Sequence, residues 1–307
     1  MSTKRVFLVT GATGKVGGQV ARKLLAQGHT VRVFGRDAER LGALVEAGAI
    51  PAIGDMQNAA SVLDAFDGVD AALLIGQGSR TARDYRREFA LVGEHYAAAA
   101  KSKGLKSAVF ISTLGAGSDH NRGLVLVHSD IEHSLNGVDG LSLVNLRAPM
   151  FLENLFYFLH PMRTTNTLTW PVKSDALVDL GSTAEVADVA VDFLTANPAQ
   201  NKRVVELYGH TAVTLTEVGE MIGNVLGRPF NVRPSSREED VEILCGAGFG
   251  RDFALLMNGT WESASRGLMR ETIHEHIELH GSIEEFIRRA LVPAILAQVP
   301  SELVAAT

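Results

Sequence analysis

VTGATGKVGGQVARKLL, residues 9–25, is the stretch of sequence that decides the fold of this chain. It begins inside a short apolar, β-branched run, residues 6–10, which is typical of a buried parallel strand. It ends in a segment whose apolar residues recur every four positions, at Val16, Val20 and Leu24. That spacing places them on one face of a helix. The stretch therefore predicts a strand followed by a helix, with a glycine-rich turn between them.

The glycines of this turn have the spacing of a dinucleotide cradle. Gly11 allows a tight turn, Gly14 lets the backbone approach a pyrophosphate, and Gly17 lets the helix pack closely on the strand. The start of the helix adds unpaired N–H groups and a partial positive charge. The alternative is a glycine-rich turn that holds nothing. We predict that the cofactor is bound by Gly11, Ala12, Thr13, Gly14, Lys15, Val16 and Gly17.

Strands and helices continue to alternate after this unit. Apolar runs at 31–34, 49–55, 70–76, 106–113 and 141–149 read as strands, and helical patterns fill 37–48, 61–68 and 85–100. This alternation predicts an α/β fold with a doubly wound parallel sheet of the Rossmann type. We expect residues 1–150 to form the dinucleotide-binding domain. Residues 151–307 should be mostly a smaller, largely helical substrate-binding lobe, with strands near 177–210 returning to the first domain.

Composition limits the partners that the chain could have. Its 29 basic and 35 acidic residues give a net charge of −6, which argues against binding to nucleic acid. A single cysteine, Cys245, cannot form an internal disulfide, so a reducing compartment is acceptable. We find no signal-peptide pattern and no apolar run of about 18 residues, so we expect a cytoplasmic protein without a membrane span. The oligomeric state is not indicated.

The end of the second strand bears on the choice of cofactor. An acidic residue there would bind the ribose hydroxyl of NAD, whereas an arginine would bind the 2′-phosphate of NADP. Arg36 follows the strand directly and Asp37 comes next. Because a guanidinium can grip phosphate with two hydrogen bonds, we predict NADP(H), with NAD(H) left open by Asp37. Lys15 would add a second cation, and a solvated surface arginine is the alternative for Arg36.

The glycine spacing, Gly-x-x-Gly-x-x-Gly, resembles the extended or atypical branch of the short-chain dehydrogenase/reductase superfamily. This resemblance implies that Asp55, after the third strand, contacts the adenine amino group and that Met56 packs on the ring. The alternative for Asp55 is a helix N-cap. By position alone, Ile75 and Gly76 after the fourth strand should pass near the nicotinamide ribose.

The usual catalytic pair of that superfamily, Tyr-x-x-x-Lys, is absent. None of the four tyrosines has a lysine four residues later. Ser112 ends the fifth strand, at the place of the superfamily's serine, and could orient the substrate. His128 lies near the position of the missing tyrosine and is our candidate general acid, because imidazole titrates near neutrality. The alternative for His128 is an ordinary histidine at the start of a helix.

Later motifs resemble the NmrA-like family, an atypical branch of the superfamily. The matches are Glu132 and Leu135, then Arg147 and Pro149 with Ala148 inserted between them, then Phe151 and Asn154. The resemblance implies NADPH-dependent reduction of quinones, dyes or phenolics, or regulation by a dinucleotide that is bound and not turned over.

We therefore expect an NADP(H)-dependent oxidoreductase that passes hydride to a quinone-like, enone or other small carbonyl substrate. A non-catalytic redox sensor that binds a partner protein is the alternative, and an epimerase or lyase is a further one.

Residues after the sixth strand should contact this small-molecule substrate. An apolar, aromatic lining with one amide would suit a flat organic molecule. The candidates are Met150, Phe151, Asn154, Phe158 and Trp170. For each aromatic residue, a place in the core of the lobe is the alternative. His276 and His280 would share a face of a helix, but no third ligand is evident, so we predict no metal.

Overall fold

An eight-stranded parallel sheet forms the centre of the molecule. The computed structural model describes residues 5–79, 81–198, 201–271 and 273–297. The sheet has the strand order β12-β10-β6-β5-β4-β1-β2-β3. Its strands are β1 (Val6–Val9), β2 (Thr30–Gly35), β3 (Ile50–Ile53), β4 (Ala71–Leu74), β5 (Ser107–Thr113), β6 (Ser142–Ala148), β10 (Lys202–Tyr208) and β12 (Glu275–Glu278). The order reverses between β1 and β4, which are neighbours, and ligands of open parallel sheets bind at such a reversal.

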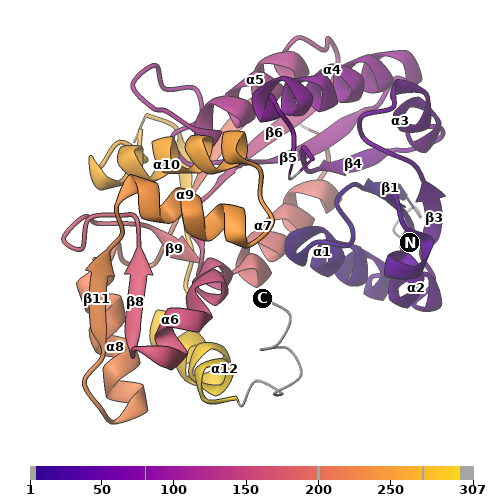
Figure 1. The fold of residues 1–307 in the computed structure, drawn as a ribbon. Coiled ribbons are helices and arrows are strands. Elements are labelled where there is room, and N and C mark those ends of the chain that lie inside the picture. The colour runs from indigo at the N-terminus through magenta and orange to yellow at the C-terminus, as the bar shows by residue number, and fades with distance from the viewer. Residues whose placement is uncertain (1–4, 80, 199–200, 272, 298–307) are drawn as a thin grey trace.

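Helices cover both faces of the sheet (Figure 1). One face carries α1 (Lys15–Ala26), α2 (Ala38–Glu46) and α7 (Thr183–Thr195). The other carries α3 (Ala59–Ala65), α4 (Tyr85–Lys103) and α5 (Leu124–Asn136). Strand residues alternate between the two cores, so that Phe7 and Val9 face α1 while Leu8 faces α4. The predicted doubly wound α/β fold is thereby confirmed.

A smaller, mostly helical lobe, built from the second half of the chain, lies beside the main sheet (Figure 1). It has its own hydrophobic core. Its two short parallel pairs are β7 (Met150–Phe151) with β9 (Leu180–Gly181), and β8 (Thr167–Trp170) with β11 (Asn231–Pro234). Its helical elements are η1 (Leu152–Phe158), α6 (Leu159–Thr164), α8 (Leu215–Leu226), α9 (Arg237–Gly246), α10 (Arg251–Ser265), α11 (Ile283–Phe286), η2 (Ile287–Leu291) and α12 (Val292–Leu296).

Two segments from the second half of the chain extend the main sheet. α7 and β10 return to it, and β12 forms its edge beside β10. The helix expected around His276 is therefore wrong. Ile277 and Leu279 alternate with polar residues, and this period of two is that of a strand. Both side chains pack in the core that the sheet shares with α1, α2 and α7. Among the described residues, we find no helix that is both long and apolar enough to cross a membrane.

Candidate functional site

The glycine loop between β1 and α1 has the geometry of a phosphate cradle. Gly11 has a φ of +61°, a left-handed conformation that favours glycine. A Cβ on Gly17 would lie 2.5 Å from the carbonyl oxygen of Gly11, so only glycine fits there. Ala12 and Val16 are buried and anchor the loop to the core. The loop is thus held rigidly where β1 meets β4.

The start of α1 is open to an anion. Gly14 is the N-cap residue, so no side chain caps the helix, and its first turn contains no acidic residue. Thr13, Gly14 and Lys15 are exposed there. The uncapped N–H groups and the positive end of the helix dipole fit the pyrophosphate of a dinucleotide.

Residues after β2 and β3 meet at one edge of this cradle. The guanidinium Nη1 of Arg36 lies 3.9 Å from Oδ2 of Asp55, and both side chains are largely exposed. Asp37 points elsewhere, because its carboxylate caps α2 by accepting from the N–H groups of Glu39 and Arg40. Of Arg36 and Asp37, Arg36 is therefore the one whose side chain is exposed and not used as a helix cap.

Asp55 does not cap the following helix. Its Oδ1 accepts from the N–H of Gln57 at 2.9 Å, whereas the N-cap of α3 is Asn58. Met56, the next residue, is half-buried, and its carbonyl oxygen lies 2.9 Å from Nδ1 of His95. The contacts expected of Asp55 and Met56 with adenine stay predictions.

The end of β4 comes directly beside the glycine loop. A Cβ on Gly11 would lie 3.1 Å from Cβ of Ile75. Ile75 is fixed through its backbone, since its N–H donates to Oγ1 of Thr10 at 2.8 Å and its carbonyl accepts from the hydroxyl of Tyr96 at 3.0 Å. Gly76 packs so tightly on Phe89 that a Cβ would lie 2.6 Å from the ring.

Two of these supporting residues were missed in the sequence. Thr10 had a visible signal, as a polar residue that ends an apolar strand. Tyr96 had no such signal, because it lies inside a helix pattern. In the structure it is buried, and burial raises the pKa of its hydroxyl strongly.

Ser112 belongs to a buried network of charged side chains. Its hydroxyl donates to Oε1 of Glu132 at 2.6 Å, and Ser112 is only 3 % exposed. Arg147 on β6 holds the same carboxylate through Nε at 3.1 Å and Nη2 at 2.9 Å. The hydroxyl of Ser112 is therefore already used as a donor inside the protein. Its role toward a substrate stays a prediction.

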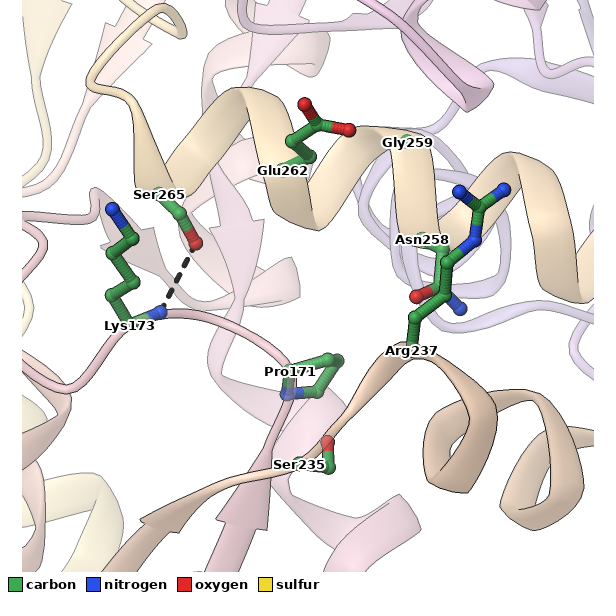
Figure 2. A pocket seen from close by; sticks show the side chains of 8 residues that line it. All are labelled: Pro171, Lys173, Ser235, Arg237, Asn258, Gly259, Glu262 and Ser265. Atoms are coloured by element: carbon green, nitrogen blue, oxygen red, sulfur yellow. Dashed lines mark hydrogen bonds between the residues drawn. The ribbon is translucent and has the colours of Figure 1, made fainter.

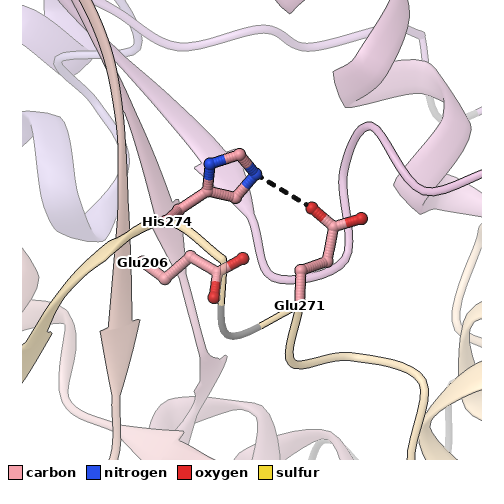
Figure 3. Close-up of side chains that lie close together, drawn as sticks. All are labelled: Glu206, Glu271 and His274. Carbon is pink, nitrogen blue, oxygen red and sulfur yellow. Dashed lines mark hydrogen bonds and ion pairs between the residues drawn. The ribbon is translucent and has the colours of Figure 1, made fainter.

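Two more carboxylates and a histidine complete this network (Figure 3). Nη1 of Arg147 lies 2.6 Å from Oε2 of Glu271 and 3.6 Å from Oε1 of Glu206. Nε2 of His274 lies 3.1 Å from the same oxygen of Glu271. Glu206, Glu271 and His274 could by their spacing hold a metal ion. However, the guanidinium already contacts both carboxylates, so we assign the group to an internal ion-pair network.

His128 lies on α5, one helical turn before Glu132. Its ring packs against Phe89 and Phe110, with ring centroids 5.2 and 6.2 Å apart. Nδ1 is 2.9 Å from the carbonyl oxygen of Leu124. Because a carbonyl can only accept, Nδ1 carries a proton, and Nε2 is the nitrogen that can gain or lose one. Burial lowers the pKa of His128, against the opposing effects of the Leu124 hydrogen bond and the charge of Glu132.

The segment that follows β6 leads past the glycine loop. Nζ of Lys15 lies 3.4 Å from the carbonyl oxygen of Glu153 and 5.6 Å from the ring centre of Phe156. Met150, Phe151 and Asn154 belong to this segment and are half-buried. The structure therefore places this group of predicted substrate contacts on the element that reaches the cradle.

The other two predicted substrate contacts lie in the core of the lobe. Phe158 is 5 % exposed and Trp170 is fully buried. Their rings stack with centroids 5.2 Å apart, and Trp261 meets Trp170 edge-on at 5.7 Å. This is the core position that the sequence had left as the alternative.

A hollow of about 300 Å³ opens elsewhere in the lobe, between the ends of β8 and β11 and the helix α10 (Figure 2). Its lining includes the polar side chains of Lys173, Arg237, Asn258 and Glu262. None of the predicted site residues lines it. We therefore place the candidate site at the cradle and not in this hollow.

The chain is similar to several known proteins. Residues 11–140, which contain the predicted cofactor contacts, match a family model described as NAD(P)H-binding. An NAD(P)H azoreductase of Xenophilus azovorans is 24 % identical over 257 residues, covering 82 % of this chain and 85 % of its own. A (4-alkanoyl-5-oxo-2,5-dihydrofuran-3-yl)methyl phosphate reductase of Streptomyces griseus is 28 % identical, covering 73 % and 75 %.

Solved structures share the whole fold. An NADPH-dependent quinone oxidoreductase of Escherichia coli in complex with NADPH superposes with a TM-score of 0.77 at 21 % identity, covering 93 % of this chain and 99 % of that one. The triphenylmethane reductase of Citrobacter gives a TM-score of 0.73 at 21 % identity, covering 95 % and 98 %. The resemblance to atypical short-chain reductases is thereby confirmed, because the chain shares their fold and its residues 11–140 match an NAD(P)H-binding family model.

Proposed function

We propose that this protein oxidises NADPH and reduces a quinone-like, enone or other small carbonyl acceptor. The observation that carries the choice of NADPH is Arg36, which stays exposed at the end of β2 while Asp37 is used as a helix cap. The names of the similar proteins, a quinone oxidoreductase and an azoreductase among them, support the class of acceptor.

In this proposal each part of the site has one task. The glycine loop and the start of α1 bind the pyrophosphate, and Arg36 binds the 2′-phosphate. NADPH, when bound, supplies the hydride. Nε2 of His128 donates a proton to the reduced acceptor. Ser112 lies close to the reacting groups, with its hydroxyl bound to Glu132. Met150, Phe151 and Asn154 contact the acceptor.

The test is NADPH oxidation with a panel of quinones, azo dyes, enones and ketones. We expect Arg36→Glu to lower kcat/KM for NADPH by about 10- to 100-fold, the value of one hydrogen bond to a charged group, while NADH is little affected. Asp37→Asn is the matched control, because asparagine also caps helices, and it should leave the preference unchanged.

Equal use of NADH and NADPH by the wild-type protein would contradict the role of Arg36. Tight NADPH binding without oxidation by any acceptor would instead support the redox sensor that the sequence left as the alternative.

A further inference from the structure

His128 and Glu132 stand four residues apart on α5, on the same face of the helix. This is the spacing of the Tyr-x-x-x-Lys pair that the chain lacks. In that pair a neutral acid, tyrosine, becomes an anion when it gives up its proton, so a neighbouring cation assists it. A histidine acid is a cation before it gives up its proton, and an anion is therefore the neighbour that keeps it charged.

We propose that Glu132 is the positioning residue for the proton donor, so that His128 and Glu132 form a charge-inverted counterpart of the Tyr-x-x-x-Lys pair. This inference rests on the proposed function, in which His128 is the acid. Glu132 does not touch the acceptor, and it acts through His128.

The surroundings of Glu132 hold its carboxylate in a single state. Three donors reach it, two from the guanidinium of Arg147 and one from the hydroxyl of Ser112. The carboxylate accepts all three of these hydrogen bonds and donates none of them, which is the pattern of an ionised carboxylate. Its side chain is only 6 % exposed, so water screens its charge weakly. Glu132 therefore presents a fixed negative charge one turn from His128.

Within the described part of the chain, the rings that pack against His128 carry no charge. α4 contributes the ring of Phe89, and β5 contributes the ring of Phe110. Arg86 of α4 and Asp130 of α5 neutralise each other in an ion pair, with Nε of Arg86 2.7 Å from Oδ2 of Asp130. Arg147 contacts Glu132, with its Nη2 2.9 Å from Oε2 of the carboxylate. Burial disfavours the imidazolium, and the charge of Glu132 opposes this effect. Without Glu132 the pKa of His128 would be lower still, so a smaller fraction of the imidazole would carry the proton that an acid must give.

The experiment is an NMR titration of the histidine ring signals of the whole chain, with the His128 signal identified by its loss in His128→Gln. In Glu132→Gln, we expect the pKa of His128 to fall by about one unit. Glu132→Asp keeps the charge and should leave the pKa near the wild-type value. Asp130→Asn, which removes a carboxylate from the same helix, is the matched control and should also leave it unchanged. An unchanged pKa in Glu132→Gln would overturn the proposal.

Turnover supplies the second measurement. The alkaline limb of the pH profile should move to lower pH in Glu132→Gln, by the same amount as the pKa of His128. If the pKa moves and the profile does not, His128 is not the acid, which overturns the proposed function and not the charge coupling.

If Glu132→Gln does not fold, Ser112→Ala replaces it. Without the hydrogen bond from Ser112, the negative charge of Glu132 is less compensated, so the pKa of His128 should rise. A fall of this pKa would overturn the proposal.

Discussion

Two helical glycines differ in whether their surroundings leave room for a side chain. Gly17 in α1 faces the carbonyl oxygen of Gly11, and a Cβ there would lie at 2.5 Å, whereas a Cβ on Gly42 in α2 would meet nothing within 4 Å. We expect Gly17→Ala to cost at least about 1–3 kcal/mol of unfolding free energy and to weaken NADPH binding. Gly42→Ala should gain about 0.5–1 kcal/mol, because alanine is the better helix former. Urea denaturation of both variants checks this, and equal effects would contradict it.

Asp240 is a buried carboxyl whose ionisation costs stability. It is 1 % exposed and accepts one hydrogen bond from Asn258 at 2.8 Å, and burial raises its pKa from 3.8 to about 6. The folded state therefore binds the proton more tightly than the unfolded state. This contribution is present at low pH and is lost as the pH rises from 3.8 to about 6.

We expect Asp240→Asn to remove this pH dependence and to gain about 2–3 kcal/mol above pH ~6, by linkage. Denaturation at several pH values measures it. A variant that loses more stability at pH ~8 than at pH ~5 would contradict the sign that linkage requires.

At the scale of elements, Glu153 joins η1, α1 and α7. Its carboxylate accepts from the N–H of Thr183 at 3.0 and 3.1 Å, at the start of α7. Its backbone carbonyl faces Lys15 of the glycine loop at 3.4 Å. A negative charge at a helix N-terminus is stabilising.

We expect Glu153→Ala to cost about 1–2 kcal/mol and to raise KM for NADPH, because η1 is then less firmly held beside the cradle. Glu284→Ala, an exposed residue of α11, is the control and should change neither value. A loss of stability with unchanged KM would separate η1 from cofactor binding.

At the scale of the whole molecule, Arg147 joins the sheet, α5 and the segment after α10. Its side chain is 4 % exposed and lies among Glu132, Glu206 and Glu271, the second of which is fully buried. Removing the cation would leave these carboxylates without their partner. We expect Arg147→Met to cost about 3–5 kcal/mol near neutral pH, and less in acid, where carboxylates take up protons.

Arg288→Met is the control for this prediction. Its pair with Glu284 is exposed and should cost less than about 1 kcal/mol. Equal losses in the two variants, measured by denaturant unfolding, would show that the Arg147 network does not stabilise the fold.

Local patterns in the sequence were sufficient for the fold and for a prediction of the cofactor end of the site. The spacing of Gly11, Gly14 and Gly17 and the alternation of strand and helix periods are short-range features, because backbone geometry sets both. Arg36 was predicted for the same reason, since the residue after a parallel strand lies at the ligand edge of the sheet. The helix expected at His276 was wrong because β10 supplied a partner edge that a short segment cannot reveal.

Only the tertiary structure decided the other end of the site. Arg147 was visible as a charged residue in an apolar strand, but its partner Glu271 lies 124 positions away. Likewise, no periodicity tells whether Trp170 is covered by Trp261 or by a ligand. Contacts of this kind depend on which surfaces the completed fold brings together. The sequence by itself thus determined a dinucleotide-binding α/β protein, and the packing of distant segments decided how Ser112 and His128 are surrounded.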